Sequence, residues 1–136
     1  MMTKRVLLID DDKDDAAILL AAFSESGLSA ALDHFENGSL ALDTLMNNKG
    51  GIPDVIFLDI NMPVINGWEC LREIKKLAEL QSIPIVMYST FNLKSEGISA
   101  KDVGATAFFT KPDKFSELKS KLLSLFDELF TAGTPD

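Results

Sequence analysis

Short apolar runs alternate with longer stretches of helical spacing along the chain. The runs predict five strands, which cover residues 5–10, 31–36, 54–58, 84–89 and 106–109. The stretches that follow them predict five helices, which cover residues 12–26, 38–48, 66–79, 93–102 and 114–130. A regular alternation of strand and helix is typical of βα units, so we expect an α/β fold with a parallel sheet.

The apolar residues also indicate which surfaces are buried. The first, third and fourth predicted strands are apolar without alternation, as expected when helices cover both faces of a parallel sheet. The last predicted helix has one apolar side, formed by Phe115, Leu118, Leu122, Leu125, Phe126, Leu129 and Phe130. The helix predicted over 93–102 is the weakest, because Gly97 and two serines lower helix stability. We therefore expect this segment to be a mobile element.

Three of the predicted strands lead into charged residues. Asp10 and Asp11 close the first strand, and Asp59 closes the third. Lys111 follows the fifth strand. The carboxyl ends of parallel strands meet at one edge of the sheet, where open α/β sheets hold their sites, so we expect these side chains to lie together. Crowded carboxylates repel unless a cation offsets their charge, and oxygen ligands favour Mg²⁺, so the sequence predicts a magnesium site.

Composition and charge limit the cellular compartments and the binding partners that are compatible with the sequence. The 136 residues, 46% of them hydrophobic, suit one domain over 1–136, with a core over about 4–130 and a tail over 131–136. The formal net charge of −8 disfavours nucleic acid and an anionic membrane surface as partners. The single cysteine, Cys70, excludes an internal disulfide and suits a small core residue of a cytoplasmic protein. No apolar run has the length of a membrane span or of a signal-peptide core.

Four short motifs stand at the ends of predicted strands, in one order along the chain. They are Ile9-Asp10-Asp11-Asp12, then Asp59-Ile60-Asn61-Met62-Pro63 with Gly67, then Tyr88-Ser89-Thr90, then Gly104-Ala105-Thr106 with Phe109-Thr110-Lys111-Pro112. Together they resemble the response-regulator receiver domain, the phosphoacceptor module of two-component signalling, over nearly the whole chain. The resemblance implies a flavodoxin-like fold, a doubly wound five-stranded parallel sheet of order 2-1-3-4-5 with helices on both faces.

The resemblance implies a phosphoacceptor and a metal site. Asp59 matches the phosphoacceptor, whose carboxylate would attack a phosphohistidine on a sensor histidine kinase or a histidine phosphotransfer protein. Asp11 matches a direct ligand of Mg²⁺, and Asp10 a ligand that binds directly or through water. Asn61 would contribute its backbone carbonyl. Mn²⁺ could replace Mg²⁺ at such a site.

The resemblance also implies how the phosphoryl group is stabilised. Lys111 would pair with Asp59 at rest and with a phosphoryl oxygen afterwards, and Ser89 would hydrogen-bond another oxygen. In-line phosphoryl transfer needs mainly positioning and charge stabilisation, which Mg²⁺ and the lysine would supply. Pro112 resembles a cis proline of the family, and a cis bond there would fix the direction of the lysine.

Two residues match the switch of the family. Movement of Ser89 toward a phosphoryl group would open space for the ring of Phe108, which stands where the family often has tyrosine. This movement would bias the face formed by the fourth helix, the fifth strand and the fifth helix. We expect the region from Leu93 to Phe130 to be read by a downstream protein or to pair with a second copy of the chain. Phe91, near the mouth of the site, is expected to restrict water and lengthen the phospho-aspartate lifetime.

Other polar and aromatic residues have simpler explanations. Asp12, Asp14 and Asp15 are first-turn acids that the helix dipole favours. His34 stands on the second strand, away from the acids, and is not expected to have a chemical function. Trp68 is expected to pack against the core.

Two further functions compete with a stand-alone receiver that is a switch and not an enzyme. A phosphatase of the haloacid-dehalogenase type also uses a nucleophilic aspartate at a strand end, and Asp10 and Asp12 form its Asp-x-Asp pair. The chain lacks the Thr or Val that this family places two residues after the Asp-x-Asp pair. Turnover of a small phosphate ester would distinguish such a phosphatase from a receiver. A pseudo-receiver would keep the fold with a dead site, but every chemical residue is present. After Lys111 we expect one helix and a tail, with no output domain.

Overall fold

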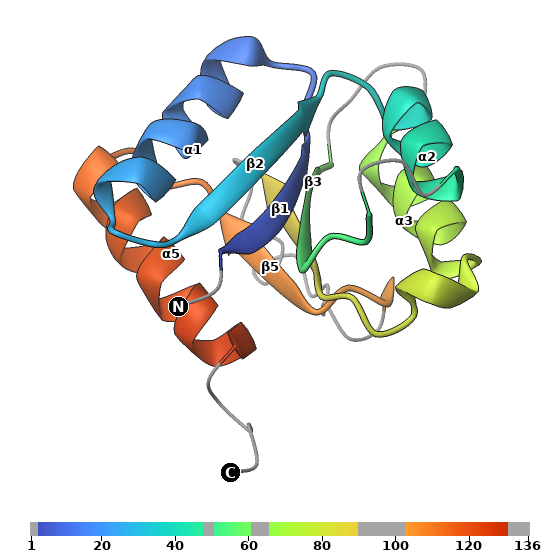
Figure 1. Cartoon of the computed structure of the whole chain (residues 1–136). Helices are drawn as coiled ribbons and strands as arrows, with labels where there is room; N and C mark the ends of the chain where they lie inside the picture. Colours follow the sequence, from blue (N-terminus) through green and yellow to red (C-terminus); the bar gives the residue numbers. More distant parts are fainter. Residues whose placement is uncertain (1–2, 48–50, 61–65, 90–102, 131–136) are drawn as a thin grey trace, which may run out of the picture.

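The computed structural model describes residues 3–47, 51–60, 66–89 and 103–130, which form one parallel sheet between two layers of helices (Figure 1). The strands are β1 Lys4–Ile9, β2 Ala30–Phe35, β3 Val55–Asp59, β4 Ile85–Ser89 and β5 Ala107–Thr110. The helices are α1 Lys13–Glu25, α2 Gly38–Met46, α3 Gly67–Lys75 and α5 Phe115–Phe130, with a short 3₁₀ helix, η1, at Ala78–Leu80. The sheet order is β2-β1-β3-β4-β5, which confirms the doubly wound α/β fold.

The sheet divides the hydrophobic core into two clusters. Along β1, Leu7 and Ile9 belong to the cluster under α2 and α3. Val6 and Leu8 belong to the other cluster, under α1 and α5. Figure 1 shows the same division, with α1 and α5 on one side of the sheet and α2 and α3 on the other. Both faces of the central strands are therefore buried, which explains why their sequences are apolar without alternation.

The register of the sheet brings the predicted site residues to one edge. Ile9 of β1 pairs with Leu58 of β3, so the residues that follow both strands emerge side by side. Asp59 pairs with Tyr88, and Ser89 pairs with Thr110. The carboxyl ends of β1, β3, β4 and β5 thus lie in one row, with Lys111 directly after the last of them.

One local prediction was wrong. The helix predicted over 66–79 ends at Lys75, because Lys76 and Leu77 donate to carbonyls three residues back and Leu77 then adopts an extended backbone. The buried Leu80 of η1 continued the apolar spacing and so made the segment resemble a single helix. The sequence left the isomer of the bond before Pro112 open, and the described residues contain no cis peptide bond, so this bond is trans. The predicted helix over 93–102 lies outside the described residues.

Gly67 joins the start of α3 to the end of β3. Its N–H donates to the carbonyl of Ile60 at 2.9 Å. A Cβ at this position would lie 2.6 Å from the Cα of Ile60 and would also collide with the carbonyl of Asp59. Only glycine allows this approach, and Asn66 caps the helix beside it with a capping box to Glu69. The position of α3 and that of the Asp59 backbone are therefore linked directly.

None of the helices in the described part of the chain combines the length and the hydropathy that crossing a membrane would require.

Candidate functional site

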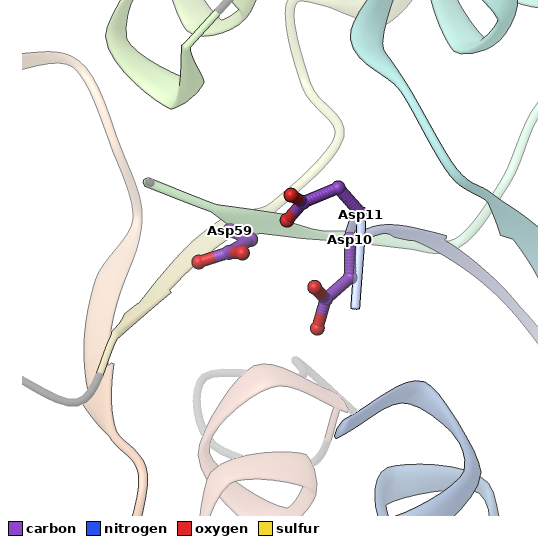
Figure 2. A group of neighbouring side chains, drawn as sticks. All are labelled: Asp10, Asp11 and Asp59. Atoms are coloured by element: carbon purple, nitrogen blue, oxygen red, sulfur yellow. The ribbon is translucent and has the colours of Figure 1, made fainter. Parts of the chain in front are cut away.

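Three aspartates meet at the carboxyl edge of the sheet. Asp10 and Asp11 follow β1, and Asp59 is the last residue of β3. One carboxylate oxygen of each lies within 4.8 Å of those of the other two. In Figure 2, the side chain of Asp11 extends toward the side of Asp59, and that of Asp10 turns toward the layer of α1 and α5. Asp10 and Asp59 are buried and Asp11 is exposed, so the cluster opens to solvent on one side.

Asp10 accepts three hydrogen bonds, and its own backbone N–H donates to the carbonyl of Phe35 at 3.0 Å. Its Oδ1 accepts from the N–H of Asp12 at 2.9 Å, and its Oδ2 accepts from the hydroxyl of Tyr88. Its backbone carbonyl lies 2.8 Å from Nε2 of His34, which must carry the proton because a carbonyl oxygen only accepts. His34 therefore supports the β1–α1 turn, a contact that the sequence did not predict.

Lys111 lies among three carboxylates. Its Nζ is 2.7 Å from Oδ2 of Asp15, 3.8 Å from Oδ2 of Asp10 and 4.0 Å from Oδ1 of Asp59. The expected partner, Asp59, is the most distant of the three. Asp15 was interpreted only as a first-turn acid, but Asp12 caps α1 and the helix turns Asp15 toward β5. The ammonium is therefore shared between α1 and the acidic cluster.

The charge of Lys111 is stabilised by this neighbourhood. Burial alone would lower the pKa of the ammonium, but the hydrogen bond to Asp15 and the charges of Asp59 and Asp10 outweigh it and raise the pKa. The side chain of Lys111 thus stays cationic at neutral pH and can offset the negative charge of the site.

Ser89 and Phe108 stand on the two strands that border Lys111. Ser89 ends β4 and is buried, and its carbonyl accepts from the backbone N–H of Lys111 at 2.7 Å. Phe108 is half-buried and meets Trp68 of α3 edge to face, with ring centroids 6.3 Å apart. The expected packing role of Trp68 is thus confirmed. Asn61, Thr90 and Phe91 lie outside the described residues.

A hollow of about 330 Å³ opens beside the acidic cluster, between α1 and the start of α5. Asp15 and Lys111 form its polar wall, and Ile18 and Phe115 stand at its rim with much of their side chains exposed. The remaining lining residues are Leu19, Tyr88, Phe109, Pro112, Asp113, Lys114 and Leu118. The hollow gives a side chain of another molecule access to the region around Lys111.

The sheet order and the acidic cluster at its carboxyl edge define a phosphoacceptor module of the receiver type. The sequence model of the response regulator receiver domain matches residues 6–123, and the chain belongs to this family. Proteins of the family are phosphorylated on an aspartate and bind a divalent metal through an acidic cluster, which Asp10, Asp11 and Asp59 fit. This membership argues against the haloacid-dehalogenase alternative.

Three relatives illustrate the similarity. Response regulator MprA of Mycobacterium sp. (strain KMS) is 30% identical over 135 residues, which are 99% of this chain and 56% of MprA, so the chain spans little more than half of that relative. The bacteriophytochrome response regulator RtBRR has 30% identity and a TM-score of 0.79, covering 99% of this chain and 82% of its own. The Mn²⁺-bound form of response regulator Rcp1 has 26% identity and a TM-score of 0.76, covering 98% and 99%.

Proposed function

We propose that the chain is a receiver that accepts a phosphoryl group on Asp59 in the presence of Mg²⁺. The observation that carries the proposal is the position of Asp59, a buried carboxylate that lies within 4.8 Å of two further acids and 4.0 Å from the ammonium of Lys111. A carboxylate in this setting is a nucleophile with a cation on one side and a metal-binding pair on the other. The domain would span 1–136 and act in the cytoplasm.

The donor set suits Mg²⁺, with Mn²⁺ as a substitute. Asp11 and Asp59 would bind the ion directly, Asp10 directly or through water, and Asn61 through its backbone carbonyl. Three carboxylates provide the hard oxygen ligands that Mg²⁺ prefers, and the exposed Asp11 leaves room for the waters that this ion keeps. The bound ion would neutralise charge on the phosphoryl oxygens.

The phosphoryl donor would be a phosphohistidine of a sensor histidine kinase or a histidine phosphotransfer protein. A carboxylate oxygen of Asp59 would attack phosphorus in line, so that a P–O bond forms as the P–N bond to histidine breaks. Lys111 would bind one phosphoryl oxygen, and the hydroxyl of Ser89 would donate a hydrogen bond to another. The step modifies the chain itself, so the protein is a switch rather than an enzyme with a separate product.

Phosphorylation would be read at the face that contains β5 and α5, together with the segment expected to form the fourth helix. Ser89 lies on β4 and Phe108 on β5, and these two strands are hydrogen-bonded to each other. A movement of Ser89 would therefore be transmitted to Phe108 through the hydrogen bonds between the two strands. A downstream protein, a further relay component or a second copy of the chain would bind this face. We expect neither nucleic acid nor a membrane to be a direct partner, because the net charge is −8.

The test is intact mass after incubation with acetyl phosphate and Mg²⁺. We expect one phosphoryl adduct on the native chain, none on Asp59→Asn, and none without Mg²⁺. Asp33→Asn, which changes an exposed aspartate on β2, is the control and should accept the phosphoryl group as the native chain does. An adduct that persists in Asp59→Asn would assign the acceptor elsewhere.

A further inference from the structure

Tyr88 lies between the acidic cluster and Lys111. It is the only tyrosine of the chain, it is 2% exposed, and it pairs with Asp59 across β3 and β4. The surrounding β4 residues are buried and apolar, so the phenol is the one group of this strand before Ser89 that can donate a side-chain hydrogen bond. The proposed roles of the acids, the lysine and the serine leave this residue without a function.

The hydroxyl end of Tyr88 holds Asp10. It donates to Oδ2, while the N–H of Asp12 occupies Oδ1, so both oxygens of Asp10 are oriented by donors. A phenol is protonated at neutral pH, so the hydroxyl of Tyr88 can donate to the carboxylate of Asp10. Each carboxylate oxygen has a second lone pair, which remains for an ion or for a water bound to it.

The ring of Tyr88 holds Lys111. The Nζ of Lys111 lies 4.4 Å from the ring centroid, within the range of a cation–π interaction. The ring itself is fixed by Phe57, whose centroid is 6.1 Å away in an edge-to-face contact. One buried side chain therefore contacts an acid of the metal site through its hydroxyl and the cation of the site through its face.

We propose that Tyr88 is a positioning residue of the phosphoacceptor site, whose hydroxyl orients Asp10 for the divalent ion and whose ring orients Lys111 for the phosphoryl group. The inference rests on the proposed function and adds a residue to it. Donors that fix a carboxylate ligand reduce the freedom it loses on binding a metal, and their removal commonly weakens metal binding 10–100-fold. Removal of the ring should instead weaken the binding of a phosphoryl group, because Lys111 would no longer be oriented toward it.

The first experiment measures Mg²⁺ affinity by calorimetry in the native chain and in Tyr88→Phe. The variant keeps the ring and loses only the hydroxyl, so we expect Mg²⁺ to bind about 10-fold more weakly. Thr106→Val, which removes a hydroxyl that accepts from Ile85 away from the acids, is the control and should bind Mg²⁺ as the native chain does. Unchanged or tighter binding in Tyr88→Phe would overturn the role of the hydroxyl. Absence of Mg²⁺ binding in the native chain would instead count against the proposed function.

The second experiment measures the affinity for trifluoroberyllate, a phosphoryl analogue, at Mg²⁺ concentrations that saturate each variant. Tyr88→Phe retains the ring and should bind the analogue within about 2-fold of the native chain, whereas Tyr88→Leu should bind it about 5-fold more weakly. Thermal unfolding of both variants checks that they are folded at the temperature of the titration. Equal affinities of the Phe and Leu variants would overturn the role of the ring, and that comparison does not depend on the hydroxyl.

Discussion

The ammonium of Lys111 sits closer to an acid of α1 than to the proposed phosphoacceptor. The 2.7 Å ion pair with Asp15 is a charge-assisted hydrogen bond, whereas the 4.0 Å separation from Asp59 is only an electrostatic contact. In the proposed function Lys111 must move toward a phosphoryl oxygen, and this movement stretches the bond to Asp15. Asp15 and the phosphoryl group thus compete for one cation.

This competition predicts that Asp15→Asn binds trifluoroberyllate more tightly at saturating Mg²⁺. A partly exposed ion pair contributes about 0.5–1 kcal/mol, so the gain should be about 3-fold. Asp14→Asn is the matched control, because it removes the same charge from the same turn at an exposed position. Weaker binding in Asp15→Asn alone would mean that Asp15 orients Lys111 toward the phosphoryl group rather than away from it.

The sequence identified the residues that close strands, but not those that reach the site from elsewhere. Asp10, Asp11 and Asp59 could be predicted because parallel strands end at one edge. The contact of Asp15 depends on the rotation of α1, which begins at Lys13, two residues after Asp11. Tyr88 could have been noticed as a lone polar group in a buried strand, but its partner depends on the register of β4 against β3.

A second prediction at this scale concerns Cys70, which is fully buried in α3. Burial, with a smaller contribution from Glu73, raises the pKa of its thiol to about 12. The unfolded thiol ionises near pH 8.5, so above that pH the unfolded state binds fewer protons than the folded state, and stability falls as pH rises. The contribution of the buried thiol to the free energy of unfolding is fully present below about pH 8.5. Above that pH it decreases by about 1.4 kcal/mol per pH unit, up to the pKa of the folded state.

Denaturant unfolding at pH 8 and pH 10 measures this effect. The free energy of unfolding should fall more steeply between the two pH values in the native chain than in Cys70→Ala, which has no thiol to ionise. Parallel slopes would show that the thiol keeps an ordinary pKa when buried.

At the scale of elements, the close contact between the end of β3 and the start of α3 at Gly67 positions the acidic cluster. The N–H of Gly67 bonds the carbonyl of Ile60, and the space that a side chain would need is filled by the backbone of Asp59 and Ile60. Any side chain at Gly67 must move either α3 or the end of β3. Because Asp59 is the last residue of β3, a change made for packing would also alter the candidate site.

We therefore expect Gly67→Ala to lower both the stability and the Mg²⁺ affinity of the protein. The stability loss should be about 1–3 kcal/mol, as for other overpacked sites, and the affinity loss about 10-fold. Gly27→Ala is an informative control, because Gly27 has φ +81° with no atom within 4 Å of an added Cβ. That variant should lose about 1 kcal/mol of stability through backbone strain and keep its Mg²⁺ affinity. Equal Mg²⁺ affinities of Gly67→Ala and the native chain would show that the contact between β3 and α3 does not affect the candidate site.

The elements themselves were largely predictable. Each described strand begins and ends within one residue of its predicted bounds, because continuous apolar runs are short and end sharply in charged or turn residues. The end of α3 was not predictable, since Leu77 and Leu80 keep apolar spacing after the helical hydrogen bonds have changed. The spacing of apolar residues indicates which side chains are buried. It does not indicate which carbonyl accepts from each backbone N–H, and this hydrogen bonding decides where the helix ends.

At the scale of the whole molecule, the acidic edge links metal binding to folding. The carboxylates of Asp10, Asp11 and Asp59 come together only in the folded sheet, so an ion that binds them stabilises the folded state. At a Mg²⁺ concentration 100 times the dissociation constant the gain is about 2.7 kcal/mol. For a domain of this size we expect the Tm to rise by on the order of 10 °C.

Calorimetric scans with and without Mg²⁺ test this expectation. Asp11→Asn, which removes the exposed carboxylate of the cluster, should lose most of the Mg²⁺-dependent rise in Tm. Asp14→Asn should keep the rise, because that exposed acid of the same stretch of chain does not belong to the cluster. An equal rise in both variants would attribute the effect to non-specific screening of the net charge of −8.

The edge-to-face contact between Trp68 and Phe108 also gives the protein an optical reporter of its own. The chain has one tryptophan, so all indole emission comes from a single place, and that place borders the ring which the proposed function sets in motion. Rotation of Phe108 would change the polarity and quenching around the indole. Stopped-flow fluorescence of the unlabelled chain, mixed with acetyl phosphate and Mg²⁺, would therefore time the arrival of the signal at α3 without an attached dye.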